Sequence, residues 1–277
     1  MGRGNRQARP CLHVGRIQVA RTLEAPQLEN PAATTAEHQP LLDAIAALPE
    51  DWHGAGSVNR VVLDAIARHC SALGPIRNSA ETGAGRTTLL LSHLSAQHWV
   101  FSVDVSGSLG QTRASPLLRS ATVSFIEGPT QLTLPTHRFD GEYQVVLLDG
   151  PHGYPFPDLE YYYFYPHIQT GGLLIIDDVQ IPSIGRMLDI IKADAMFELL
   201  EVVADMAFLR RTGAPLVDPL SDSWWLQGYN SAYLEKVTSP PRASLLRKLL
   251  NLLAKFTPAP IKKKLPKRLK AKFWERM

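Results

Sequence analysis

Glu81-Thr82-Gly83-Ala84-Gly85-Arg86-Thr87-Thr88 is the stretch that decides the fold. A β-rich run from Ile76 precedes it, and an apolar helical pattern follows it as far as Leu94. Its two glycines allow a sharp turn and the close approach of a ligand to bare main chain. The N–H groups at the start of the following helix would point at that ligand. A strand, a Gly-x-Gly turn and a helix are typical of the opening of a nucleotide-type binding site.

Two residues of this stretch bear on the kind of nucleotide. A dinucleotide fingerprint would have a third glycine where this sequence has Thr88. The carboxylate of Glu81 would repel a phosphate, but it suits the sulfonium and ammonium groups of S-adenosylmethionine, which has no phosphate. The stretch therefore favours S-adenosylmethionine over an NAD-type cofactor. An ordinary glycine turn in an α/β protein is the third interpretation.

Strand patterns alternate with helix patterns on both sides of the glycine turn. This alternation predicts an α/β fold, a doubly wound Rossmann-like sheet of about seven strands with helices on both faces. The sheet is expected to be mostly parallel, with a C-terminal antiparallel hairpin. The further strands are predicted at 99–105, 121–126, 143–148, 173–176, 197–203 and 206–211, and the helices at 40–48, 61–73, 158–168 and 183–192.

Length and composition suggest one main domain with two extensions. We predict an irregular N-terminal extension at 1–50, an α/β domain at 51–235 that carries the glycine turn, and a basic amphipathic tail at 236–277. The only cysteines of the 277 residues are Cys11 and Cys70, which suits a reducing cytosol. No apolar run reaches the roughly 18 residues of a membrane-spanning helix, and no secretory signal is recognisable. We therefore expect a cytoplasmic location.

The tail is strongly basic. Residues 242–277 contain 12 of the 29 Lys and Arg residues and one acid, Glu275. Residues 244–256 place leucines on one helix face and basic residues on the other, which predicts an amphipathic basic helix. Such a tail suits an anionic membrane surface, with a peripheral location at the inner membrane. The alternative is docking on the acidic body of the same or a partner subunit in a homo-oligomer, and a nucleic acid partner is the least favoured.

Acidic residues follow five successive predicted strands. Because the carboxyl ends of parallel strands meet at one edge of a sheet, these carboxylates should lie together and repel one another unless a cation sits between them. Asp104 lies 19 residues after Gly85, where an acid can bind a ribose diol. A solvated strand-end aspartate is the alternative for Asp104. The acids are Glu81, Asp104, Glu127, Asp149 and the pair Asp177-Asp178.

The last two strand ends predict a metal site. Asp149, Asp177 and Asp178 could hold Mg²⁺, a cation that prefers oxygen ligands. Alternatively, Asp149 touches the cofactor while Asp177 and Asp178 cap the next helix. His152 lies in a Gly- and Pro-rich loop after Asp149 and could accept a proton near neutral pH. A loop imidazole bonded to backbone is the alternative for His152.

This order of motifs resembles the class I S-adenosylmethionine-dependent methyltransferases, over the segment from Glu81 to about Ile191. Within that class it looks most like the metal-dependent, catechol O-methyltransferase-like enzymes of a bacterial branch, similar to enzymes of antibiotic and glycan tailoring. The segment Glu127-Gly128-Pro129-Thr130-Gln131 is similar to the loop with which that group holds adenine. The sequence departs from the group at His152, where a lysine is usual, and at Asp178, where an asparagine is usual.

The resemblance implies an enzyme that transfers a methyl group from S-adenosylmethionine to a hydroxyl of a small-molecule or glycan acceptor. His152 and Asp149 would be catalytic, and Mg²⁺ would assist on Asp149, Asp177 and Asp178. An NAD-type oxidoreductase and a non-catalytic, membrane-associated binding protein are the alternatives. The cofactor would be held by Glu81, Gly83, Gly85, Thr87, Asp104, Thr130, Gln131 and Asp149.

Overall fold

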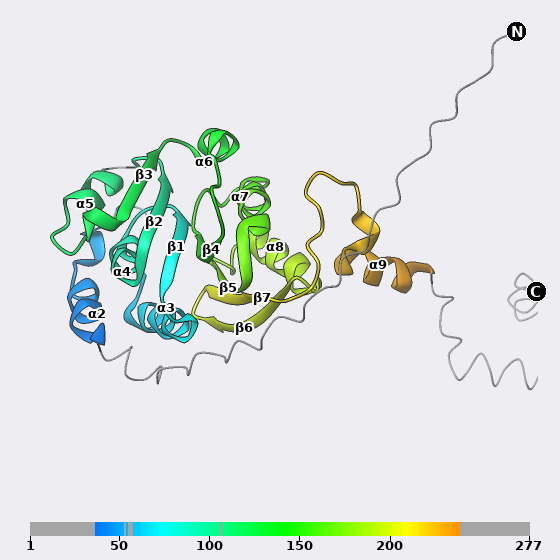
Figure 1. The fold of residues 1–277 in the computed structure, drawn as a ribbon, viewed down its shortest axis with the longest axis horizontal. Coiled ribbons are helices and arrows are strands. Elements are labelled where there is room, and N and C mark those ends of the chain that lie inside the picture. Colours follow the sequence, from blue (N-terminus) through cyan, green and yellow to red (C-terminus); the bar gives the residue numbers. More distant parts are fainter. Residues whose placement is uncertain (1–36, 53, 55–57, 106, 239–277) are drawn as a thin grey trace, which may run out of the picture.

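The computed structural model describes residues 37–52, 54, 58–105 and 107–238, which are drawn in colour in Figure 1. Most of the predicted N-terminal extension and the basic stretch from 242 onward lie outside the described residues. The predicted amphipathic helix at 244–256 is among them, so it stays a prediction.

A seven-stranded sheet forms the centre of the molecule (Figure 1), in the order β3-β2-β1-β4-β5-β7-β6. Strands β1 to β5 pair in parallel, and β7 runs antiparallel to both β5 and β6. The prediction of a mostly parallel sheet with a C-terminal hairpin is confirmed. The strands are β1 (Ile76–Thr82), β2 (Ser95–Ser102), β3 (Val123–Glu127), β4 (Tyr143–Leu148), β5 (Ile168–Ile176), β6 (Phe197–Val203) and β7 (Met206–Arg211).

Helices cover both faces of the sheet, as predicted. Successive side chains of β4 point to opposite faces of the sheet, so Val145 and Leu147 pack on one face and Val146 and Leu148 pack on the other. Because helices bury both faces, this strand is apolar along most of its length. One face is covered by α2 (Gln39–Ala46), α3 (Arg60–Leu73) and α4 (Arg86–Leu94), and the other by α7 (Phe156–Phe164) and α8 (Pro182–Lys192). The shorter α5 (Ser108–Ala114) and α6 (Thr130–Thr133) and the last described helix, α9 (Gly228–Thr238), complete the set.

Helix α2 belongs to the packed body. Its Leu42 and Ile45 are fully buried in the same core as α3 and α4. The guanidinium of Arg86, at the start of α4, donates to the carbonyls of Leu48, Pro49 and Val58. The chain between α2 and α3 is therefore tied to the end of the glycine turn.

The bounds of β2 and β5 differ most from those predicted, and those of β3 differ by one or two residues. β2 ends at Ser102, so Asp104 lies in the following loop rather than at the end of the strand. β5 begins at Ile168, at the end of the segment predicted as a helix, and runs through Gly171 and Gly172, before the predicted start of this strand at 173. The strand continues because its pairing with β4 absorbs an irregularity between Tyr143 and Val145. No helix in the described part of the chain is both long and apolar enough to span a membrane.

Candidate functional site

A cavity of about 610 Å³ opens at the carboxyl edge of the sheet. It lies beside β1 and β4, where the strand order reverses, and ligands of doubly wound sheets bind at such switch points. The sequence-predicted residues that line it are Gly83, Gly85, Thr87, Thr130, Gln131, Asp149, His152, Asp177 and Asp178. Two others, Glu81 and Asp104, do not line it.

The glycine turn runs close against the end of β4. Gly83 has φ +83°, and a Cβ there would lie 2.4 Å from the backbone oxygen of Asp149. Only glycine tolerates both the left-handed conformation and the contact. The turn thus brings bare main chain, the start of α4 and Asp149 to the same wall of the cavity.

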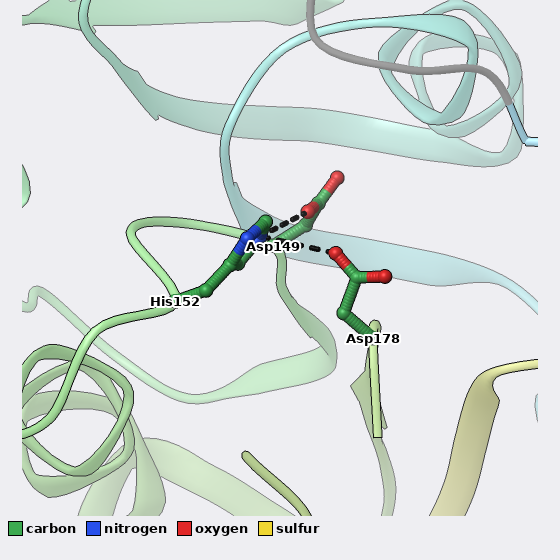
Figure 2. Close-up of side chains that lie close together, drawn as sticks. All are labelled: Asp149, His152 and Asp178. Atoms are coloured by element: carbon green, nitrogen blue, oxygen red, sulfur yellow. Dashed lines mark ion pairs between the residues drawn. The ribbon is translucent and has the colours of Figure 1, made fainter. Parts of the chain in front are cut away.

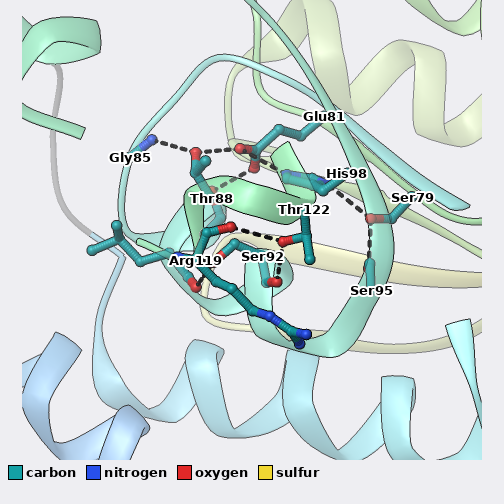
Figure 3. Close-up of polar contacts among 11 residues, drawn as sticks. Ser79, Glu81, Gly85, Thr88, Ser92, Ser95, His98, Arg119 and Thr122 are labelled. Carbon is teal, nitrogen blue, oxygen red and sulfur yellow. Dashed lines mark hydrogen bonds and ion pairs between the residues drawn. The ribbon is translucent and has the colours of Figure 1, made fainter. Parts of the chain in front are cut away.

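Glu81 lies beneath the turn, fully buried (Figure 3). Its carboxylate accepts hydrogen bonds from the hydroxyls of Thr87, at 2.8 Å, and Thr88. The Thr88 hydroxyl in turn accepts the N–H of Gly85 at 2.9 Å. Thr88, which stands where a dinucleotide fingerprint would have its third glycine, therefore links the turn to the buried Glu81 through its hydroxyl. A glycine has no side chain to make this link.

A chain of polar groups continues from Glu81 across the sheet. Nε2 of His98, on β2, lies 3.3 Å from Oε1 of Glu81. Nδ1 of His98 is 2.7 Å from the hydroxyl of Ser79, which donates to Ser95 at 2.6 Å. All of these side chains are buried, and Figure 3 shows them in one continuous network. Glu81 does not line the cavity itself, but it is hydrogen-bonded to Thr87, which does.

Glu160, on α7, is a site-forming residue that sequence reasoning missed. The hydroxyl of Thr82 donates to Oε2 of Glu160 at 2.7 Å and accepts the backbone N–H of Asp149 at 2.9 Å. A Cβ on Gly150 would lie 1.9 Å from Oε1 of Glu160. This carboxyl group therefore supports the loop that carries Asp149. The sequence feature that could have pointed to this role is the position of Glu160 within the apolar and aromatic run Phe156–Phe164, where an acid is expected to be buried.

Three side chains that line the cavity, those of Asp149, His152 and Asp178, lie close together (Figure 2). Nε2 of His152 lies 3.1 Å from Oδ2 of Asp178 and 3.8 Å from Oδ1 of Asp149. One ligand atom from each of the three residues falls within 4.8 Å of the others, close enough for a metal ion. Each side chain is a quarter to two-fifths exposed, so a ligand can reach them.

The pKa values in this cluster are shifted upward by burial and by like charges. Asp149 raises the pKa of His152, with Asp178 and Asp177 adding to the effect against partial burial. Burial and the neighbouring carboxylates raise the pKa of Asp177 to about 8 and also raise the pKa of Asp149. A cation placed among these groups would relieve the repulsion.

Asp177 takes a different position from the one expected of a metal ligand. Its Oδ1 accepts the backbone N–H of Asp178 at 2.9 Å, and it is not part of the group whose ligand atoms lie within 4.8 Å. Asp178 has φ +56°, and its Oδ2 lies 3.1 Å from Nε2 of His152. The structure thus brings together Asp149, Asp178 and the imidazole rather than three carboxylates.

Asp104 is exposed in the loop after β2. Its Oδ1 accepts the backbone N–H of Leu109 at 3.0 Å and so caps the start of α5. Its neighbours Val103 and Val105 line the cavity. The predicted contact with a ribose remains a proposal for this carboxylate.

Residues 80–179 match the model of a family described as a methyltransferase domain. Among solved structures, the chain is similar to a Staphylococcus aureus protein provisionally named a caffeoyl-CoA O-methyltransferase, with 14% identity, 65% of this chain and 98% of that chain covered, and a TM-score of 0.51. It is also similar to the O-methyltransferase TomG from Streptomyces achromogenes, with 12% identity, 66% and 96% covered, and a TM-score of 0.48. No curated protein matches the chain by sequence.

The family match bears out the resemblance to class I S-adenosylmethionine-dependent methyltransferases, and the similarity to the Staphylococcus aureus structure shows the shared fold. The matched segment begins just before Glu81 and ends just after Asp178, so it contains most of the cavity wall. An NAD-type oxidoreductase is not favoured.

Glu81→Ala is expected to lower the free energy of unfolding by about 3–5 kcal/mol, because it leaves the hydroxyls of Thr87 and Thr88 and the ring of His98 without their buried partner. Urea denaturation measures the change. The control is Glu127→Ala, which removes an exposed ion pair with Arg113 and should cost about 1 kcal/mol or less. Equal losses in the two variants would contradict a structural role for Glu81.

The raised pKa of the buried Glu160 carboxyl group predicts that the stability of the fold depends on pH. Burial raises its pKa from 4.5 to about 7, so between these values the unfolded chain releases a proton that the folded chain keeps. Stability should therefore fall as pH rises through this window and level off above it. Relative to Glu160→Gln, wild-type stability should drop by about 2.5 kcal/mol between pH 5 and pH 8. A difference that does not change with pH would show that Glu160 is not protonated in the fold.

Proposed function

We infer from the methyltransferase domain at residues 80–179 that the chain transfers the methyl group of S-adenosylmethionine to a hydroxyl oxygen, with His152 accepting the hydroxyl proton. The observation that carries this proposal is the position of His152, between Asp149 and Asp178 and on the same cavity as the glycine turn. A small-molecule or glycan acceptor is proposed from the sequence resemblance to tailoring enzymes.

The cavity wall fits the proposed cofactor. When bound, S-adenosylmethionine supplies a methyl group on a positively charged sulfur. Gly83 and Gly85 offer bare main chain, and the nearby carboxylates offer negative charge to a cationic group rather than a phosphate. Thr130 and Gln131 line the wall proposed for adenine, and Asp104 is proposed to bind the ribose.

Glu81 is proposed to act on the cofactor site indirectly. Because it is fully buried and hydrogen-bonded to Thr87 and Thr88, it positions the turn and the start of α4 rather than touching the cofactor. Thr87 is then the residue of this group that faces the cofactor, since it lines the cavity.

The surroundings of His152 suit a general base. Asp149 and Asp178 orient the ring and stabilise the imidazolium that forms when it takes a proton. The hydroxyl of Ser183, at the start of α8, donates to the backbone oxygen of His152 and holds the loop in place. A raised pKa also strengthens the imidazole as a base once it is neutral.

A divalent cation is a second candidate, favoured by the grouping of ligand atoms. Asp149, Asp178 and His152 would hold it, and it would supply positive charge that lowers the pKa of a hydroxyl. His152 would then be a ligand and could not accept the proton. The mixed nitrogen and oxygen set suits a transition ion better than the Mg²⁺ expected from the sequence.

His152→Gln should lower kcat/KM by about 10²- to 10⁴-fold and leave the affinity for S-adenosylhomocysteine unchanged, because a general base contributes about this much to the rate. In the wild type, kcat/KM should be low at acidic pH and rise through the pKa of His152, which lies above 6.5, because only the neutral ring accepts a proton. A panel of phenols and hydroxylated sugars serves as acceptors. His93→Gln, away from the cavity, is the control and should keep the wild-type profile.

Chelator and Asp178→Asn distinguish the two candidates. If His152 is the base, activity survives excess chelator, and Asp178→Asn lowers the pKa read from the pH profile because it removes a negative charge beside the ring. If a cation is required, chelator abolishes turnover, Mn²⁺ restores it, and calorimetry shows that Asp178→Asn weakens Mn²⁺ binding. Binding of NADH in place of S-adenosylhomocysteine would overturn both.

A further inference from the structure

A second cavity, of about 290 Å³, lies between α7 and α8. These two helices cover the same face of the sheet and lie side by side in Figure 1. Both contribute side chains spaced three and four residues apart, which share one face of a helix. Of the described residues, none lines both this cavity and that of the glycine turn. The side chains from α7 and its end are those of Asp158, Tyr161, Tyr162 and Tyr165.

The segment 217–221 forms a third wall of this cavity, and the tyrosines hold it there. The hydroxyl of Tyr165 donates to the backbone oxygen of Val217 at 2.8 Å, and that of Tyr162 donates to Pro219 at 3.4 Å. The backbone N–H of Val217 donates to Sδ of Met196 at 3.4 Å. The cavity is therefore enclosed by three parts of the chain that are bonded to one another.

Tyr161 offers a ligand both a ring and a hydroxyl. Its ring stacks on that of Tyr165, with centroids 5.1 Å apart. Its hydroxyl has no hydrogen-bond partner in the part of the chain that the structure describes. Burial, with Asp194 nearby, raises the pKa of Tyr161, so this hydroxyl stays neutral. Aromatic rings attract cations, and a phenol oxygen accepts a hydrogen bond from an ammonium group.

The charges in the wall are all negative. Asp158, Asp194 and Asp218 line the cavity, and among the described residues no Lys, Arg or His does. Within that part of the chain none of the three carboxylates forms an ion pair. The guanidinium of Arg211, which lies near Tyr161, is already used, because it donates to three backbone carbonyls. Aromatic rings beside unpaired carboxylates suit an organic cation.

The carboxylates are spread along the length of the cavity. Because β4, β5 and β6 run in the same direction, α7 and α8 both begin at the carboxyl edge of the sheet. Asp158 lies in the first turn of α7, about 10 Å along the helix from Tyr165. Burial raises the pKa of Tyr165, and the carboxylates of Asp218 and Asp194 add to the effect, so both lie near that second end. A linear ligand with two positive groups could therefore reach carboxylates at both ends.

We propose that the cavity between α7 and α8 binds a small aliphatic diamine or polyamine. One ammonium group would contact Asp158 and another Asp194 or Asp218, through charge-assisted hydrogen bonds. The methylene chain would pack on the tyrosine rings and on Met187 of α8, which lines the same cavity. A bare metal ion would leave the apolar wall uncovered, and an uncharged ligand would leave the carboxylates without a counter-charge. This binding does not depend on the proposed methyl transfer.

Calorimetric titration of the full chain with putrescine tests the proposal. The wild type should bind putrescine saturably, and the uncharged diol of the same length should not bind. The double variant Asp158→Asn with Asp194→Asn should bind putrescine at least roughly tenfold more weakly, because hydrogen bonds to charged groups contribute most to such binding. Each amide keeps an oxygen that can accept the backbone N–H groups bonded by Asp194.

Methionine methyl groups report where putrescine binds in the unaltered protein. Met187 and Met196 line the proposed site, and Met206 is buried in the core on the other face of the sheet. In NMR spectra of methyl-labelled protein, putrescine should shift the signals of Met187 and Met196 and leave that of Met206 in place.

Two single variants are matched controls. Asp189→Asn removes a carboxylate of α8 that pairs with Lys192 and does not line the cavity, and Asp178→Asn removes a carboxylate of the other cavity. Both should bind putrescine like the wild type. Absence of saturable binding, or equal binding of the diol, overturns the proposal. Binding that Asp178→Asn weakens and the double variant does not also overturns it, because putrescine would then occupy the cavity of the glycine turn.

Discussion

The burial of one carboxylate, that of Glu81, is the constraint on which the rest of the structure depends. A charge removed from water is stable only where hydrogen bonds and opposite charge replace its hydration. Here the partners come from two elements, because Thr87 and Thr88 start α4 and His98 lies on β2, while Glu81 itself lies near the end of β1. The hydrogen bonds that Glu81 accepts from the start of α4 hold the glycine turn in place between β1 and α4.

The rest of the site is built against that turn. Gly83 touches the backbone of Asp149, and Thr82 joins Asp149 to Glu160, so the end of β4 is held from both β1 and α7. The loop after β4 then carries His152 to Asp178, at the end of β5. The glycine turn and the backbone of Asp149 are therefore positioned by buried hydroxyl and carboxyl groups behind them, as pre-organised sites require.

Much of the fold and part of the site could be predicted from local patterns. β4, β6 and β7 have the predicted bounds, because each is a short run rich in apolar residues. The residues that line the cavity were found because strand ends of a parallel sheet share an edge. Asp104 does not line the cavity, and Asp177 lines it without joining the group of Asp149, His152 and Asp178. Each of these two carboxylates accepts a backbone N–H of its own loop, and such contacts depend on exact backbone geometry.

The sequence by itself determined the sheet, the glycine turn and the set of acids at its edge, because these depend on the periodicity of apolar residues and on spacing along the chain. Only the tertiary structure decided which of those acids face the cavity. It placed Glu81 inside and His152 between Asp149 and Asp178, and it brought Glu160 of α7 next to Thr82, which lies 78 residues away along the chain. The reason is physical. A carboxylate lies wherever its hydrogen-bond donors are, and those donors come from elements that only folding brings together.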